Sequence, residues 1–199
     1  MAANPNSMNR KEITRKLTDI LICDRLIDRK YYAKEVTLDY GTAHPKRIDV
    51  MQFIPQGVMH VSDIEKGIFI CYEVKSCKED VYSGNGLNFY GDENYIVTTM
   101  QTYKDLQDNL REGKLDQHIK EFMGLSRCPE YGFLVPVPDY IDLRNHNACY
   151  DEFANPTPLD SYDNWHLWKI YGMQKKQSRS RSMTELLFCM LRAKHNSSN

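Results

Sequence analysis

The sequence has no apolar run that approaches the roughly 18–20 residues needed to span a bilayer. Its opening stretch, MAANPNSMNRKE, lacks the apolar core of a secretory signal, so we expect a cytoplasmic protein with no membrane partner. The six cysteines include no CxxC pair, and in a reducing cytoplasm we expect free thiols. These absences favour a soluble protein without disulfides.

The chain also lacks a strong net charge, because 26 basic residues face 27 acidic ones and leave −1. A protein that coats nucleic acid through bulk charge is more basic than this, so any such contact must come from a local patch. No phosphate-binding glycine loop, dinucleotide fingerprint or Ser/His/Asp motif is present. What remains is a chain of 199 residues, 41% of them hydrophobic, which suits one globular domain with its own core.

The hydrophobic pattern predicts the order of elements in residues 9–138, the expected core. We expect a helix over 9–27, then strands over 30–41, 45–55 and 67–76. A glycine- and asparagine-rich loop over 77–94 follows, then a strand over 95–99, a helix over 100–123 that bends near Gly113, and a strand over 131–138. This αβββαβ order predicts an α/β fold with a mixed sheet flanked by helices.

The flanking segments are expected to be less regular. Residues 1–8 read as a disordered lead-in, and 139–164 as an irregular excursion. A strand over 165–173, a basic serine-rich segment over 175–182 and a helix after a Ser182–Glu185 capping box follow. We therefore expect 139–199 to form a strand–helix extension that packs on the core.

Charged residues end the strand IFICYEVKS (68–76), although its first part looks buried. Residues two apart share a face of a strand, so Glu73 and Lys75 follow the apolar Phe69 and Cys71 on one side. In the preceding strand, Asp49 lies two residues from the apolar Met51 and therefore shares a face with it. If these strands pair, as a short connection favours, the two carboxylates meet at one end of the sheet.

Two adjacent carboxylates in a buried place would force one of them to keep its proton, and a divalent cation removes that conflict. Mg²⁺ accepts one or two carboxylates together with waters and phosphates. Asp49, Glu73 and the carbonyl of Val74 could hold the ion, and Lys75 could orient a water or stabilise phosphate charge. The alternative is an ordinary solvated strand end, where such charges contribute little.

Asp49 followed by Glu73-Val74-Lys75 at the end of the next strand, after a helix and an antiparallel meander, resembles the PD-(D/E)xK nuclease superfamily. Asp49 matches the first acid of that pattern, Glu73 the second acid and Lys75 the lysine. Ile48 stands where the family often has proline. The segments EVKSCKEDVYSGNGLNFYGDENYIV and KKQSRSRSMTELLFCMLR are similar to MmcB-like DNA-repair proteins and their phage-encoded relatives.

The resemblance implies a restriction-endonuclease-like core and Mg²⁺- or Mn²⁺-dependent hydrolysis of DNA in a protein of phage or mobile-element origin. It also implies a catalytic glutamate in the first helix, which Glu12 matches, although a capping box with Asn9 explains Glu12 equally well. A second possibility is an inactive module on the same fold that binds DNA or a protein, such as a phage inhibitor of a host defence. A homodimer and a purely structural phage protein also stay open.

DNA contacts are expected from two places. The loop 84–95 offers glycine backbone and the amides of Asn85 and Asn88, with a tight structural loop as the alternative. The tail offers the only basic cluster without an interleaved acid, with a solvated linker as its alternative. That cluster consists of Lys175, Lys176, Arg179 and Arg181.

Other polar residues carry weaker hypotheses. Asp80 is expected near the metal but, like Asp92, not as a direct ligand. A zinc site is conceivable, but the spacings follow no paired-ligand motif. Its ligands would be Cys128, His146, Cys149 and His166.

Overall fold

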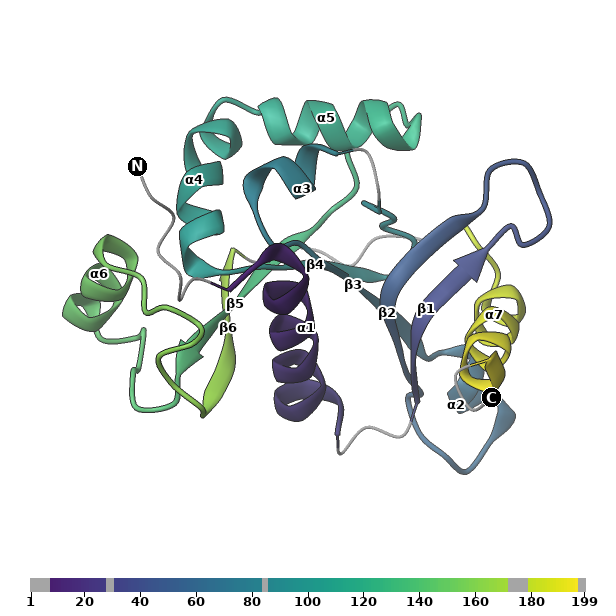
Figure 1. Ribbon diagram of the computed structural model, residues 1–199. Helices are drawn as coiled ribbons and strands as arrows, with labels where there is room; N and C mark the ends of the chain where they lie inside the picture. The colour runs from purple at the N-terminus through teal and green to yellow at the C-terminus, as the bar shows by residue number, and fades with distance from the viewer. Residues whose placement is uncertain (1–7, 28–30, 84–85, 172–178, 197–199) are drawn as a thin grey trace.

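The strands of the protein form one mixed sheet in chain order, β1-β2-β3-β4-β5-β6 (Figure 1). The structure is a computed structural model that describes residues 8–27, 31–83, 86–171 and 179–196. Strands β1, β2 and β3 form an antiparallel meander, β3, β4 and β5 run parallel, and β6 returns antiparallel to β5. The strand bounds are β1 Tyr32–Leu38, β2 Lys46–Ile54, β3 Ile68–Val74, β4 Glu93–Val97, β5 Gly132–Pro138 and β6 Trp165–Tyr171.

Helices cover both faces of this sheet. On one face α1 packs its buried leucines against Tyr72 and Val97. On the other face α4 and α5 pack against Ile96 and Phe133, and α7 packs against the β1–β3 end of the sheet. The helices are α1 Arg10–Leu21 with a π-helical continuation Ile22–Leu26, α2 Val61–Glu65, α3 Lys78–Tyr82, α4 Met100–Arg111, α5 Lys114–Met123, α6 His146–Ala154 and α7 Met183–Asn196. The prediction of a mixed α/β sheet flanked by helices is confirmed.

Local signals in the sequence place several helix boundaries. Asn9 and Glu12 form the predicted capping box at the start of α1, with each side chain bonded to the other residue's backbone N–H. The predicted bend in the helix over 100–123 is a break at Gly113, whose φ of +68° lies in the left-handed region that favours glycine. Met8, expected in the disordered lead-in, packs against the α1 cluster, while residues 1–7 lie outside the described residues.

Two features differ from the expected pattern. The segment 139–164 contains α6, which begins at Asn145, whose side chain accepts hydrogen bonds from the N–H groups of Asn147 and Ala148. This helix was missed because it buries a single polar residue, Glu152, and so shows no apolar stripe. The connection between β2 and β3 likewise contains the short helix α2.

Strand β5 contains two prolines and ends at the second of them, Pro138. Pro136 and Pro138 lie within β5, paired with β6. Proline lacks the N–H that a second neighbouring strand would need. Here β4 pairs with β5 only as far as Leu134, so the prolines occupy a part of β5 with no partner on that side.

Candidate functional site

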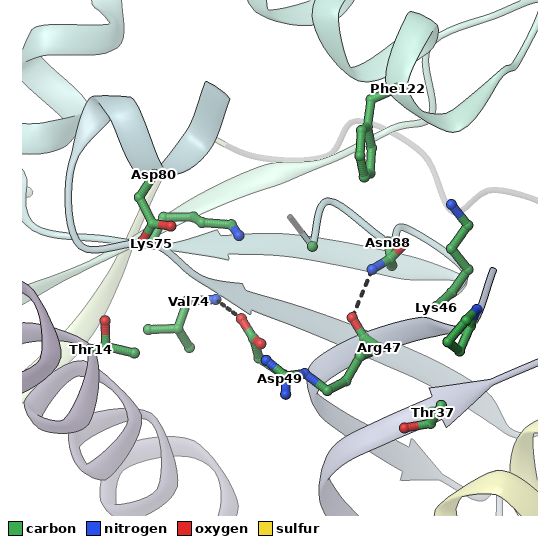
Figure 2. A pocket seen from close by; sticks show the side chains of 12 residues that line it. Thr14, Thr37, Lys46, Arg47, Asp49, Val74, Lys75, Asp80, Asn88 and Phe122 are labelled. Atoms are coloured by element: carbon green, nitrogen blue, oxygen red, sulfur yellow. Dashed lines mark hydrogen bonds between the residues drawn. The ribbon is translucent and has the colours of Figure 1, made fainter. Parts of the chain in front are cut away.

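A pocket of about 690 Å³ opens at the end of the sheet where β2 and β3 part (Figure 2). The last rung of their ladder is Val50 opposite Tyr72, and β2 continues beyond it paired with β1 alone. Helices from both faces reach this end of the sheet. The lining residues are Thr14 of α1, Thr37 of β1, Pro45, Lys46, Arg47 and Asp49 of the β1–β2 hairpin, Val74 and Lys75 at the end of β3, Asp80 of α3, Gly86 and Asn88 of the following loop, and Phe122 of α5.

Asp49 and Glu73 lie opposite each other on the two strands, one residue beyond that rung. The N–H of Val74 donates to Asp49 Oδ2 at 2.8 Å, so a side chain takes the place of a backbone acceptor where the ladder ends. The two carboxyl groups are close enough for each to shift the pKa of the other. The structure thus brings together the two acids that the strand pattern places on one face.

Glu73 is the completely buried member of this pair, because its side chain has no exposed surface. The N–H of Asn88 donates to Glu73 Oε1 at 3.1 Å, and the side-chain amide of Asn88 donates to the carbonyl of Arg47 at 2.7 Å. Within the described part of the chain, Glu73 Oε2 is buried and receives no hydrogen bond. This oxygen is an acceptor that the fold leaves for a proton or a cation.

Burial governs the charge state of the pair. Burial, and then the charge of Asp49, raise the pKa of Glu73 well above its ordinary value of 4.5. Burial also raises the pKa of Asp49, although the Val74 N–H and the Lys75 ammonium act in the opposite direction. Without a cation the pair therefore tends to share a proton, as two close carboxylates do.

Lys75 approaches the pair from the same face, two residues after Glu73, and is 4% exposed. Its N–H donates to the carbonyl of Val97, and its own carbonyl accepts from the hydroxyl of Thr98 at 2.6 Å, so the backbone is fixed to β4. In Figure 2 the ammonium of Lys75 points toward the middle of the pocket. The end of β3 thus places the carboxyl group of Glu73 and the ammonium of Lys75 close to each other.

Gly86 closes the site from the loop side. A Cβ added there would lie 3.0 Å from Glu73 Oε2 and 3.4 Å from Lys75 Nζ, and the residue has a φ of +72°. Both the left-handed backbone and the close approach to the buried carboxylate therefore require glycine at this position.

The acidic side chains of this site offer carboxylate oxygens, the donors that a hard divalent cation prefers. Mg²⁺ commonly takes one or two carboxylates and keeps waters or phosphates in its other positions. Asp49 and Glu73 supply two carboxyl groups, and no donor from the described segments reaches the buried Glu73 Oε2. The described residues contain no group of three or more His, Cys, Asp and Glu side chains that could hold a metal ion, so the zinc hypothesis gains no support.

Several residues predicted for the site have other contacts. The Glu12 carboxylate accepts from the Asn9 N–H at 2.8 Å in the capping box, and Glu12 is not among the described residues that line the pocket. Asp80 lines the pocket and accepts hydrogen bonds from the N–H and hydroxyl of Ser76. Asp92 instead accepts from the N–H of Phe69, at the opposite end of β3. Of these three acids, only Asp80 lies at the pocket.

The tail arginines that were predicted to contact DNA form internal ion pairs. Arg179 pairs with Asp92 at 3.2 Å. Arg181 binds both oxygens of Asp39, at 3.0 and 2.8 Å, and also pairs with Glu185. These two guanidinium groups hold the start of α7 to the sheet, and their charges are compensated by carboxylates of the protein itself. Asn85, Lys175 and Lys176 lie outside the described residues.

Sequence reasoning missed the cationic and aromatic side of the pocket. Lys46 and Arg47 precede Asp49 by two or three residues, and this short basic run was the one available signal. Phe122 comes from a helix far along the chain, where its apolar character predicts only burial. Asn88 was predicted as a DNA contact, and the structure places it as the residue that holds Glu73.

Comparison with models of known protein families, with curated proteins and with solved structures finds no match for this chain. Among the helices of the described segments, none is both long and apolar enough to cross a membrane.

Proposed function

We propose that the protein is a metal-dependent nuclease of the PD-(D/E)xK kind that hydrolyses phosphodiester bonds in DNA. One observation carries this proposal: Asp49 and Glu73 lie opposite each other where the β2–β3 ladder ends, close enough for each to shift the pKa of the other, and Lys75 follows on the same face of β3. The MmcB-like resemblance of the sequence points in the same direction.

Asp49 and Glu73 would hold Mg²⁺ or Mn²⁺, with the carbonyl of Val74 as a further oxygen donor. The bound ion supplies positive charge for the phosphate and lowers the pKa of a bound water. Glu73 is wholly buried and its Oε1 accepts from the Asn88 N–H, so the position of its carboxyl group is fixed before an ion would enter.

Lys75 serves the reacting phosphate in this proposal. Its ammonium lies beside the carboxyl pair and under Gly86, where it can hold a water by hydrogen bonding and offset charge that develops on the phosphate. Lys46 and Arg47 line the same pocket and would bind the adjoining phosphates of the strand. Together these residues give a site that combines cation-binding acids with anion-binding bases.

The test is cleavage of supercoiled plasmid and of end-labelled oligonucleotides by purified protein in Mg²⁺ or Mn²⁺. We expect cleavage that EDTA abolishes and that Glu73→Gln and Lys75→Met each reduce by at least about 100-fold, the scale of a lost catalytic group. Asp108→Asn is the matched control, since that carboxylate lies on α4 with 84% of its side chain exposed.

Two results would contradict the enzyme proposal. If no form of DNA is cut in either metal although the protein is folded, the pocket is not that of an active nuclease. If DNA is cut but Glu73→Gln cuts equally well, the carboxyl pair is not the metal site. Binding of DNA without cleavage would support instead the inactive module that the complete burial of Glu73 also allows.

A further inference from the structure

The pocket has a second end, away from the carboxyl pair. Figure 2 shows Phe122 and Lys46 on one side of the pocket, and Lys75, Asp80 and Thr14 on the other. Lys46 Nζ lies over the Phe122 ring, 5.4 Å from its centroid. Phe122 is the aromatic residue among the described pocket-lining side chains, and both it and Lys46 are half-buried.

A ring and an ammonium in contact match the two parts of a nucleotide. Aromatic rings stack on bases of any sequence, and lysine ammoniums bind backbone phosphates. A cation over an exposed ring is held more weakly than a stacked base. An entering base can therefore displace the ammonium from Phe122, and Lys46 can then bind the phosphate attached to that nucleotide.

Stacking on Phe122 requires a base whose face is free. In a duplex each base face is covered by the next base pair, so only a single strand or a flipped nucleotide offers one. The site also demands that the strand enter the pocket, because Lys75, which lines it, is only 4% exposed. Both features favour an unpaired strand over a duplex laid across the mouth.

We propose that Phe122 and Lys46 form a nucleotide subsite that stacks an unpaired base, and that the protein prefers single-stranded DNA over duplex DNA. This inference rests on the proposed function for the identity of the ligand, but not for its cleavage. It gives Phe122 a role in addition to its packing against the hydrophobic core under α5.

The experiment measures binding, so that cleavage is not needed for the readout. A fluorescein-labelled single strand and the same sequence as a blunt duplex are titrated with full-length protein in EDTA, and again in Ca²⁺. We expect the single strand to bind at least about tenfold more tightly than the duplex. Phe122→Leu, which keeps an apolar side chain but removes the ring, should lower single-strand affinity by about tenfold, and Phe122→Trp should preserve it.

Phe188→Leu is the matched control, because Phe188 is a phenylalanine of α7 that also lies near a cation, with Arg192 5.9 Å from its ring. It is 61% exposed and does not line the pocket, so this variant should bind DNA as the wild type does. Lys46→Ala provides a second test that leaves the ring in place. It should reduce the dependence of log affinity on log salt by about 0.7, the value for one phosphate contact to a single strand.

The outcomes separate this inference from the proposed function. Equal affinity for single strand and duplex, with no effect of Phe122→Leu or Lys46→Ala, overturns the subsite even if the protein cuts DNA. Preferential single-strand binding that depends on Phe122 supports the subsite even if no DNA is ever cut. If Phe122→Leu disturbs folding, as a lower melting temperature would reveal, Phe122→Trp and Lys46→Ala decide the question.

Discussion

Replacing Glu73 with glutamine removes one carboxyl group from the buried pair while keeping its shape. Burial and the charge of Asp49 raise the pKa of Glu73 well above 4.5 in the folded state, so this carboxyl group keeps its proton at pH values where an exposed glutamate is ionised. In the unfolded chain the same carboxyl group ionises near its ordinary pKa. Between those two pKa values the folded protein therefore binds more protons than the unfolded one.

The sign and size of the effect follow from this difference in bound protons. The free energy of unfolding falls as the pH rises wherever the folded state holds the extra proton, by up to about 1.4 kcal/mol per pH unit for one proton. The fall begins near pH 4.5 and ends where the pH passes the folded-state pKa of Glu73. Glu73→Gln cannot titrate, and its amide can donate to Asp49, so its stability should decline less with pH and exceed that of the wild type at neutral pH.

Urea unfolding in EDTA from pH 5 to pH 8 measures this directly. Subtracting the Glu73→Gln curve of unfolding free energy against pH from the wild-type curve removes the contributions of groups that titrate in both proteins. Asp108→Asn, whose carboxylate is 84% exposed, should run parallel to the wild type. Parallel curves for Glu73→Gln and the wild type would refute the shared proton. Added MgCl₂ should stabilise the wild type by about 2.7 kcal/mol at 100 times its Kd, and should leave Glu73→Gln unchanged.

The remaining predictions concern the loop, the tail and the first helix. Gly86→Ala should lower the free energy of unfolding by about 1–2 kcal/mol, because alanine is strained at a φ of +72° and its Cβ would lie 3.0 Å from Glu73 Oε2. Gly86→Ala should also weaken the stabilisation of the protein by MgCl₂. If MgCl₂ stabilises this variant as much as the wild type, the loop that contains residue 86 can move away from Glu73. Arg181→Ala should cost about 1 kcal/mol in urea unfolding through the lost pair with Asp39 and leave DNA affinity unchanged. A large drop in DNA affinity would show instead that Arg181 contacts DNA. Glu12→Ala should cost about 0.5–1 kcal/mol through its lost cap without reducing DNA cleavage, and a folded but inactive variant would mean that Glu12 is catalytic.

The strand pattern predicted much of the sheet and the centre of the site. Side chains alternate strictly along a strand, so the position of Glu73 two residues after Cys71 places it on a known face without any tertiary information. Short connections made the pairing of β2 with β3 the natural choice, and Asp49 then falls opposite Glu73. These inferences succeed because they depend on local geometry.

Long-range contacts could not be predicted in this way. Nothing in the sequence around Arg181 indicates that its guanidinium binds Asp39, which lies 142 residues earlier in the chain. A basic run looks the same whether its side chains face solvent or form ion pairs. Phe122 likewise reaches the pocket only because α5 packs over this end of the sheet.

The sequence by itself determined which face of β3 carries the acid and the lysine, where α1 begins and where the helix over 100–123 breaks. Each of these depends on a few neighbouring residues, through strand alternation, helix capping and the backbone freedom of glycine. Only the tertiary structure decided that Glu73 is completely buried, that Gly86 lies against it, and that Phe122 and Lys46 line the same pocket as Asp49 and Lys75. Burial and pocket shape are set by packing between segments distant in the chain, and that packing gives the carboxyl pair its raised pKa.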